Sequence, residues 1–207
     1  GSGKSTLINL IPRYYDVTKG SVKVDGVDVR DMTQKELRDK LGYVPQKGVL
    51  FSGTIDSNIR YGKPEITDAQ VKEAAEVAQA TEFIDTKPEK YKSPVSQGGT
   101  NVSGGQKQRL SIARAIAKDP EIFIFDDSFS ALDFKTDSQL RKALKEYTKD
   151  ATTVIVAQRI STILGADQII VLDDGHMAGI GTHKELMANC EVYQQIARSQ
   201  LSEEELA

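Results

Sequence analysis

Apolar residues recur every three or four positions in several stretches of the chain, a spacing typical of helices that bury one face. This spacing predicts helices over residues 6–15, 67–83, 102–118, 136–147, 184–188 and 192–198. In the second of these, Thr67 or Asp68 is placed to cap the helix, because either side chain can accept hydrogen bonds from first-turn N–H groups. The third is expected to end near Pro120, since proline cannot continue a helix.

Short apolar runs predict strands at residues 41–44, 122–125, 153–157 and 169–172. The runs at 122–125 and 153–157 are continuous, as expected of parallel strands buried on both faces, and the helix between them makes a β-α-β unit. Around Asp25-Gly26, residues 21–29 alternate between apolar and polar, which predicts a β-hairpin. We therefore predict an α/β fold with a mostly parallel sheet and a small antiparallel β element.

Residues 47–118 are mostly helix and loop and interrupt this α/β pattern. We expect them to form a helical subdomain inserted into a core made by residues 1–46 and 119–207. Within that subdomain, residues 87–100 are rich in Gly, Pro, Ser and Lys and are expected to be a loop.

Length and charge narrow the possible functions. A chain of 207 residues is long enough for one well-packed domain, and its net charge of −3 gives no indication of nucleic-acid binding. The single cysteine, Cys190, excludes an internal disulfide and fits a reducing compartment. The apolar runs are too short to cross a bilayer, so a membrane link would come from another chain or segment.

The chain begins with Gly1-Ser2-Gly3-Lys4-Ser5-Thr6, which matches the end of a phosphate-binding loop. Glycine lets phosphate oxygens approach backbone N–H groups; Lys4 would reach the β- and γ-phosphates, and Ser5 would ligate Mg²⁺. The alternative is a flexible start followed by a helix cap. A full loop has about three more residues before Gly1, so we expect a fragment of a longer protein.

Paired carboxylates, Asp126 and Asp127, follow the apolar run at 122–125. Ligands of α/β folds bind at the carboxyl ends of strands, where Asp126 would hold Mg²⁺ and Asp127 would face the attacking water. A solvated turn with helix capping is the alternative interpretation. The phosphate-binding loop elsewhere in the chain favours the interpretation of Asp126 and Asp127 as parts of a nucleotide site over that of a solvated turn.

The segment Ser103-Gly104-Gly105-Gln106 opens the helix expected at 102–118. It matches a capping box, in which Ser103 and Gln106 satisfy first-turn N–H groups. Two glycines in a first turn cost about 1 kcal/mol each relative to alanine, and a cap alone does not need them. Two glycines are needed if the backbone must approach a phosphate closely.

Together these motifs resemble the ATP-binding cassette (ABC) of a membrane exporter, a P-loop NTPase fold with ATP and Mg²⁺ as ligands. In that family the signature, here Ser103–Gln106, touches the nucleotide of the opposite subunit, which implies a head-to-tail dimer with a second cassette. The resemblance also implies that Gln46 senses Mg²⁺ and water. It places Asp133, in Ser130-Ala-Leu-Asp133, at the dimer interface.

Residues 49–59 resemble the exporter segment that meets the coupling helices of the transmembrane domain. Their apolar side chains are equally compatible with the core of the helical subdomain. His183 lies in a stretch typical of cassette endings and is expected to be structural.

Two departures from the family pattern are informative. Asp127 stands where the family usually has Glu, and Gln158 stands where it usually has His. A carboxylate shortened by one methylene retreats by about 1 Å, which can cost about 10²-fold in rate. Glutamine can hydrogen-bond but cannot carry the proton of histidine. The same pair is known in one subunit of heterodimeric bacterial multidrug exporters, which implies a degenerate, slow site. Residues 95–98 also lack the family's usual Glu-Arg pair.

The resemblance therefore implies a domain that binds and hydrolyses MgATP at the cytoplasmic face of the cell membrane, as part of an exporter. One alternative is a soluble ABC ATPase of DNA repair or translation, but the sequence has neither the long coiled coil nor the basic linker expected there. A second alternative is an ATP-clamped regulatory subunit without turnover.

Overall fold

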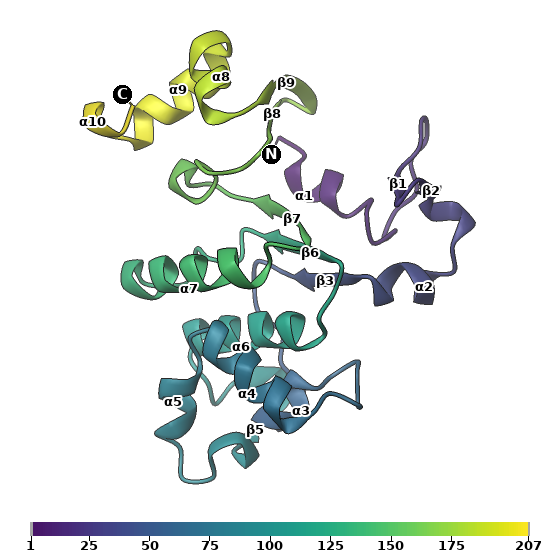
Figure 1. The fold of residues 1–207 in the computed structure, drawn as a ribbon, viewed down its shortest axis with the longest axis vertical. Helices are drawn as coiled ribbons and strands as arrows, with labels where there is room; N and C mark the ends of the chain where they lie inside the picture. The colour runs from purple at the N-terminus through teal and green to yellow at the C-terminus, as the bar shows by residue number, and fades with distance from the viewer. Residues whose placement is uncertain (1, 207) are drawn as a thin grey trace. The chain divides into compact units, whose positions relative to one another are not determined.

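The structure is a computed structural model that describes residues 2–206 (Figure 1). The chain divides into two units, one formed by residues 1–28 and 155–207 and the other by residues 29–154. The predicted subdomain of residues 47–118 lies within the second of them.

The second unit contains a short parallel sheet and most of the helices. Its elements are η1 (Val29–Asp31), α2 (Gln34–Asp39), β3 (Leu41–Val44), β4 (Gly53–Thr54), α3 (Ile55–Ile59), α4 (Asp68–Val77), α5 (Thr81–Asp85), η2 (Lys90–Lys92), β5 (Pro94–Val95), η3 (Gln97–Gly99), α6 (Gly104–Ala117), β6 (Ile122–Asp126), α7 (Phe134–Tyr147) and the first three residues of β7 (Thr152–Val156).

The sheet of this unit has the strand order β3-β6-β7. Strands β3 and β6 are parallel, with Leu41 opposite Ile122 and Val44 opposite Phe125. Strand β6 is almost entirely buried, as predicted from its continuous apolar run. Strand β7 lies at one edge of this sheet, and only its last residue, Val156, is buried, so the prediction that the run at 153–157 is buried on both faces is wrong.

Helix α6 lies close to strand β3, and helices α3 and α4 pack against it (Figure 1). Gly42 in β3 permits this approach, because a Cβ there would lie 3.4 Å from the Ala115 carbonyl oxygen on α6 and 2.7 Å from Pro120 Cγ beyond the helix. Past the end of α6, the Lys118 ammonium donates to the carbonyls of Arg38, at 2.6 Å, and Leu41, at 2.7 Å. Its burial lowers the pKa of Lys118, and the two carbonyls compensate for lost hydration.

The helix predicted over residues 67–83 is two helices in the structure, α4 and α5. The chain breaks at Gln79, whose φ of 60° lies in the left-handed region. Arg109 stabilises this break by donating from Nη1 to the Gln79 carbonyl at 2.9 Å. That contact joins residues 30 positions apart, which the local apolar spacing does not reveal.

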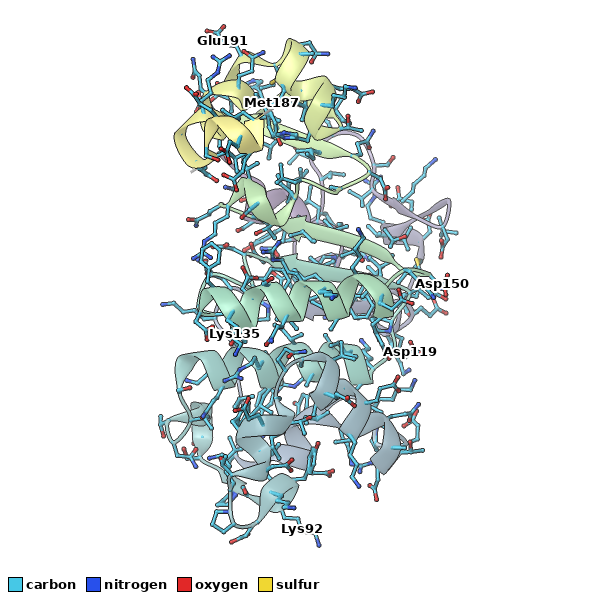
Figure 2. The ribbon with its side chains drawn as sticks, turned by 60° about the vertical axis from the view of Figure 1, so that its left-hand side comes forward. Lys92, Asp119, Lys135, Asp150, Met187 and Glu191 are labelled. Carbon is cyan, nitrogen blue, oxygen red and sulfur yellow. The ribbon has the colours of Figure 1, made fainter. Side chains whose placement is uncertain are left out.

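The loop predicted at residues 87–100 contains more structure than expected. Strand β5 lies in it and pairs antiparallel with β4, with Gly53 opposite Val95. Farther along the chain, Figure 2 shows Lys135 in the first turn of α7 and Asp150 beyond its end, where the chain turns into β7. The predicted β-α-β unit is therefore present.

The first unit contains α1 (Lys4–Ile8), β1 (Lys23–Val24), β2 (Val27–Asp28), η4 (Ile160–Thr162), β8 (Ile169–Asp173), β9 (His176–Gly181), α8 (His183–Asn189), α9 (Glu191–Gln200) and α10 (Glu203–Leu206). Strands β1 and β2 form the predicted hairpin, with Asp25 and Gly26 at positive φ. Helix α1 ends at Ile8, so the helix predicted over residues 6–15 is shorter than expected. Strand β9, which returns alongside β8, was not predicted.

A small apolar cluster holds the last part of this unit together. Val171, Leu186 and Tyr193 are buried in it. His183 Nδ1 lies 2.7 Å from the Tyr193 hydroxyl, which confirms a structural place for this histidine. Over residues 2–206, no helix combines the length and the apolar character needed to traverse a bilayer.

Candidate functional site

In the first unit, the residues of the phosphate-binding loop lead directly into helix α1. Gly3 has a φ of 95°, in the left-handed region, and a Cβ there would have its nearest neighbour 4.0 Å away. Glycine is therefore required by the backbone conformation and not by crowding. The turn between β8 and β9 fixes the loop, because the Gly175 N–H donates to the Ser2 carbonyl at 3.2 Å. Gly1 lies outside the described residues.

The side chains of Lys4, Ser5 and Thr6 are exposed at the start of α1. They provide a cation and two hydroxyl groups, and Gly3 gives the backbone the freedom to approach a ligand closely. This donor set fits a phosphate and an oxygen-coordinated Mg²⁺.

Gln158 also belongs to the first unit, where its side chain is exposed. Its carbonyl accepts a hydrogen bond from Gln200 Nε2 at 2.8 Å. The same Gln200 side chain accepts from the Ile160 N–H through Oε1, also at 2.8 Å. Through Gln200, helix α9 therefore fixes the backbone on both sides of Arg159, and this role was not predicted from the sequence.

In the second unit, Asp126 ends the buried strand β6 and is itself buried. The Tyr43 hydroxyl, on the neighbouring strand, makes a long hydrogen bond of 3.5 Å to Asp126 Oδ2. Asp126 lies at the carboxyl end of a parallel strand, which is where α/β folds bind ligands. A carboxylate in this position is a suitable ligand for Mg²⁺, directly or through water.

Asp127 is held in an uncommon backbone conformation and contacts Gln46. Its φ is 49°, in the left-handed region, where the chain turns away from β6. Gln46 Nε2 donates to Asp127 Oδ2 at 3.1 Å. The structure therefore brings together two predicted catalytic residues that are 81 positions apart in the sequence. Because the contact orients both side chains, it fits a site that positions a water molecule.

Ser103 caps helix α6 as predicted. Its Oγ accepts from the Gln106 N–H at 3.1 Å, and Gln106 Oε1 accepts from the Ser103 N–H at 3.3 Å. A Cβ at Gly104 would meet no described atom within 4 Å, and one at Gly105 would make only ordinary contacts. Packing among residues 2–206 therefore does not explain why glycine stands at both positions, although glycine makes the helix less stable than alanine would.

The Asp133 side chain caps helix α7. Its carboxylate accepts from the Thr136 N–H at 2.9 Å and from the Thr136 hydroxyl at 2.8 Å. These hydrogen bonds lower the pKa of Asp133, because they stabilise the ionised form. The preceding residues, Ser130 to Leu132, connect this cap to Asp127, and Ser130 Oγ donates to the Asp127 carbonyl at 3.2 Å.

The apolar segment after Gln46 divides between core and surface, which combines the two alternatives left open by the sequence. Buried side chains in this segment are Leu50, Ile55 and Ile59. Three others, Val49, Phe51 and Tyr61, are exposed; we call them the aromatic surface. The Phe51 and Tyr61 rings are stacked with their centroids 4.3 Å apart. The Arg114 guanidinium lies over both rings, 5.2 Å and 5.6 Å from their centroids.

Comparison with known proteins identifies this arrangement. Residues 1–130 match the family model described as ABC transporter. The chain belongs to the ABC transporter family. Over 203 residues it is 49% identical to an uncharacterized ABC transporter ATP-binding protein of Mycobacterium bovis. Over 196 residues it is 48% identical to a proposed multidrug export ATP-binding/permease protein of Staphylococcus aureus.

The fold is also similar to that of a solved ABC transporter. A bacterial Atm1-family ABC exporter with ATP bound matches 97% of the chain, with a TM-score of 0.93 and 40% sequence identity. The predicted α/β ABC ATPase fold, with its parallel sheet and antiparallel strands, is thereby confirmed. Membership of the family implies nucleotide binding and ATP hydrolysis. The chain spans about a third of these proteins: 34% of each of the two relatives and 35% of the exporter chain.

Proposed function

We propose that this chain is the MgATP-binding and ATP-hydrolysing domain of an ABC exporter, and the degenerate half of a heterodimer. The 3.1 Å contact between Gln46 and Asp127 is the observation that carries the proposal. It joins an expected sensor of Mg²⁺ and water to the carboxylate expected to orient the attacking water.

Each residue then has a defined task. Lys4 binds the β- and γ-phosphates, while Ser5, Asp126 and Gln46 hold the cation. Bound Mg²⁺ neutralises phosphate charge and helps to orient the phosphates for attack. Asp127 holds the water, and Gln158 hydrogen-bonds near the γ-phosphate.

The degenerate character follows from side-chain chemistry at two positions. Asp127 reaches about one methylene less far than a glutamate, and part of its hydrogen-bonding capacity is engaged by Gln46. Gln158 cannot carry a proton. Both residues still permit nucleotide binding, so we expect ATP to bind here and to be hydrolysed slowly.

A second, non-identical cassette is the proposed partner, in a head-to-tail dimer. Ser103, Gly104, Gly105 and Gln106 would complete the partner's nucleotide site, which gives the two glycines a reason that packing within this chain does not. Asp133 would lie at the same dimer interface. We place the aromatic surface against coupling helices of a transmembrane domain, at the cytoplasmic face of the membrane, because exposed apolar patches rimmed by polar residues mark interaction sites.

The proposal is tested in the full-length protein assembled with its partner. Asp127→Glu combined with Gln158→His should raise ATP turnover, because it restores the longer carboxylate and the protonatable side chain. Adding Lys4→Ala should abolish that gain, since the point charge on the phosphates is lost. Lys19→Ala, at an exposed position in the same unit, serves as the matched control. A correctly assembled double variant with unchanged turnover would contradict the degenerate-site proposal.

A further inference from the structure

Gln108, in the second turn of helix α6, is a polar residue that the proposed chemistry does not use. Its side chain is 1% exposed. Nε2 donates to the Pro45 carbonyl at 3.0 Å, across 63 positions of sequence. This hydrogen bond therefore joins helix α6, which begins at the signature, to the residue directly before Gln46, and Gln46 is the residue that contacts Asp127.

The other end of the Gln108 amide makes this residue costly for packing alone. Oε1 is buried and accepts no hydrogen bond from any group of residues 2–206. A buried polar atom without a partner destabilises the folded state, and an apolar side chain of the same length would avoid that cost. Because glutamine is costly here, we look for its role in the Nε2 group, which donates to the Pro45 carbonyl.

The segment around Gln46 is held at several points. Fully buried Ser128 donates from Oγ to the Val44 carbonyl at 2.7 Å, directly before Pro45. Gly48 packs on the backbone of α6, where a Cβ would lie 2.8 Å from the Lys107 carbonyl oxygen. Of these contacts, the bond from Gln108 is the one nearest to Gln46 that originates on α6.

We propose that Gln108 is a positioning residue for ATP hydrolysis. Its hydrogen bond to Pro45 sets the place of Gln46, and thereby the contact of Gln46 with Asp127. The inference rests on the proposed function, because it takes Gln46 and Asp127 to be parts of the phosphate site. Since α6 begins at the signature, the same bond connects this chain's own site to the helix that would complete the partner's site.

Gln108→Met tests the proposal, because methionine keeps the unbranched length and removes both the donor and the buried Oε1. The variant is made in the full-length, assembled protein carrying Asp127→Glu and Gln158→His, where turnover at this site is measured. We expect kcat to fall by about tenfold or more while KM for ATP stays unchanged, as for a misplaced catalytic group. Ser93→Ala is the control; it removes another buried polar atom that lacks a partner among residues 2–206, and should leave kcat unchanged.

A double-mutant cycle with Gln46→Ala separates positioning from a general structural effect. If Gln108 acts through Gln46, Gln46→Ala with Gln108→Met should be no slower than Gln46→Ala alone. Additive losses would overturn the proposal, because they would show that Gln108 acts by another route.

A spin label on a cysteine replacing the exposed Lys47 gives a readout that does not require turnover. Gln108→Met should raise the label's mobility in the MgATP-bound protein, and Ser93→Ala should not. Unchanged mobility would overturn the positioning role. If the Asp127→Glu, Gln158→His background gains no turnover, the degenerate-site proposal fails by itself, and the label still decides the role of Gln108.

Discussion

Arg114 is the residue whose replacement should most clearly disturb the aromatic surface. Its guanidinium donates to the Asn58 carbonyl and the Val49 carbonyl, each at 2.9 Å, and to Asn58 Oδ1 at 3.0 Å. It also lies over the stacked rings of Phe51 and Tyr61. Burial lowers its pKa to about 10, so the side chain stays charged at neutral pH and depends on these carbonyls in place of water.

The cost of Arg114→Met follows from these contacts. Hydrogen bonds from a charged donor contribute about 1.5–3 kcal/mol each, and the ring contacts add roughly 0.5–2 kcal/mol. The free-energy cost of burying the guanidinium offsets much of this sum. Replacing Arg114, however, leaves the two backbone carbonyls without their hydrogen-bond donor. We therefore expect a net loss of about 3 kcal/mol, within the range for a broken buried polar network. Arg114→Lys keeps the charge but cannot span both carbonyls or stack, so its loss should be intermediate.

Thermal unfolding of the purified protein, followed by calorimetry, measures the effect. For a domain of this size, about 3 kcal/mol corresponds to a fall in Tm of roughly 6–12 °C. Lys142→Met, which removes an exposed cation from α7, is the control and should leave Tm almost unchanged. If Arg114→Met shifted Tm no more than Lys142→Met, the reasoning that Arg114 holds Val49, Phe51 and Tyr61 in place would be refuted.

Two further predictions concern helix starts. Ser103→Arg should lower ATPase activity of the assembled dimer by about 10²-fold, because a bulky cation replaces a donor proposed to act on the partner's ATP; photolabelling with an ATP analogue should show unchanged binding at the Lys4 site, and loss of that binding would contradict action in trans. The pKa of Asp133 is lower in the folded protein than in the unfolded chain, where it lies near the ordinary value of 3.8, so the ionised carboxylate stabilises the fold at pH values above 3.8. This contribution is lost as the pH falls through the lower pKa of the folded state. Asp133→Asn keeps a capping oxygen without the charge, so its Tm should fall less than the parent's between pH 7 and pH 3; equal falls would argue against the cap's contribution.

The parts of the site that depend on local sequence could be predicted. The glycine at positive φ before α1, the cap at Ser103 and the carboxylates after β6 each lie within a few residues of the pattern that indicates them. The β1–β2 hairpin was predictable for the same reason, since Asp25-Gly26 sets its turn locally. Such features need no knowledge of distant contacts.

Features that depend on distant contacts were not predicted. The break at Gln79 is fixed by Arg109, and the segment after Gln46 divides into core and surface only because Arg114 and the helices cover one side of it. The left-handed conformation of Asp127 likewise follows from the tertiary turn after β6 and has no glycine to announce it. Sequence periodicity identifies the helices but not which of their polar residues reach across to other segments.

Helix α6 connects these distant features, and its links differ in strength. The helix is 14 residues long, about 20 Å at 1.5 Å per residue, so a displacement at Ser103 is carried along its whole length. Arg114 makes two charge-assisted hydrogen bonds to Asn58, a third to Val49 and two ring contacts to Phe51 and Tyr61, whereas Gln108 holds Pro45 through one neutral hydrogen bond. Charge-assisted bonds are about twice as strong as neutral ones, so the link to Pro45 is the one that yields first. If α6 moved, the hydrogen bond from Gln108 to Pro45 would therefore break before the contacts of Arg114, and Gln46 would lose its support from the helix while Val49, Phe51 and Tyr61 stayed in place.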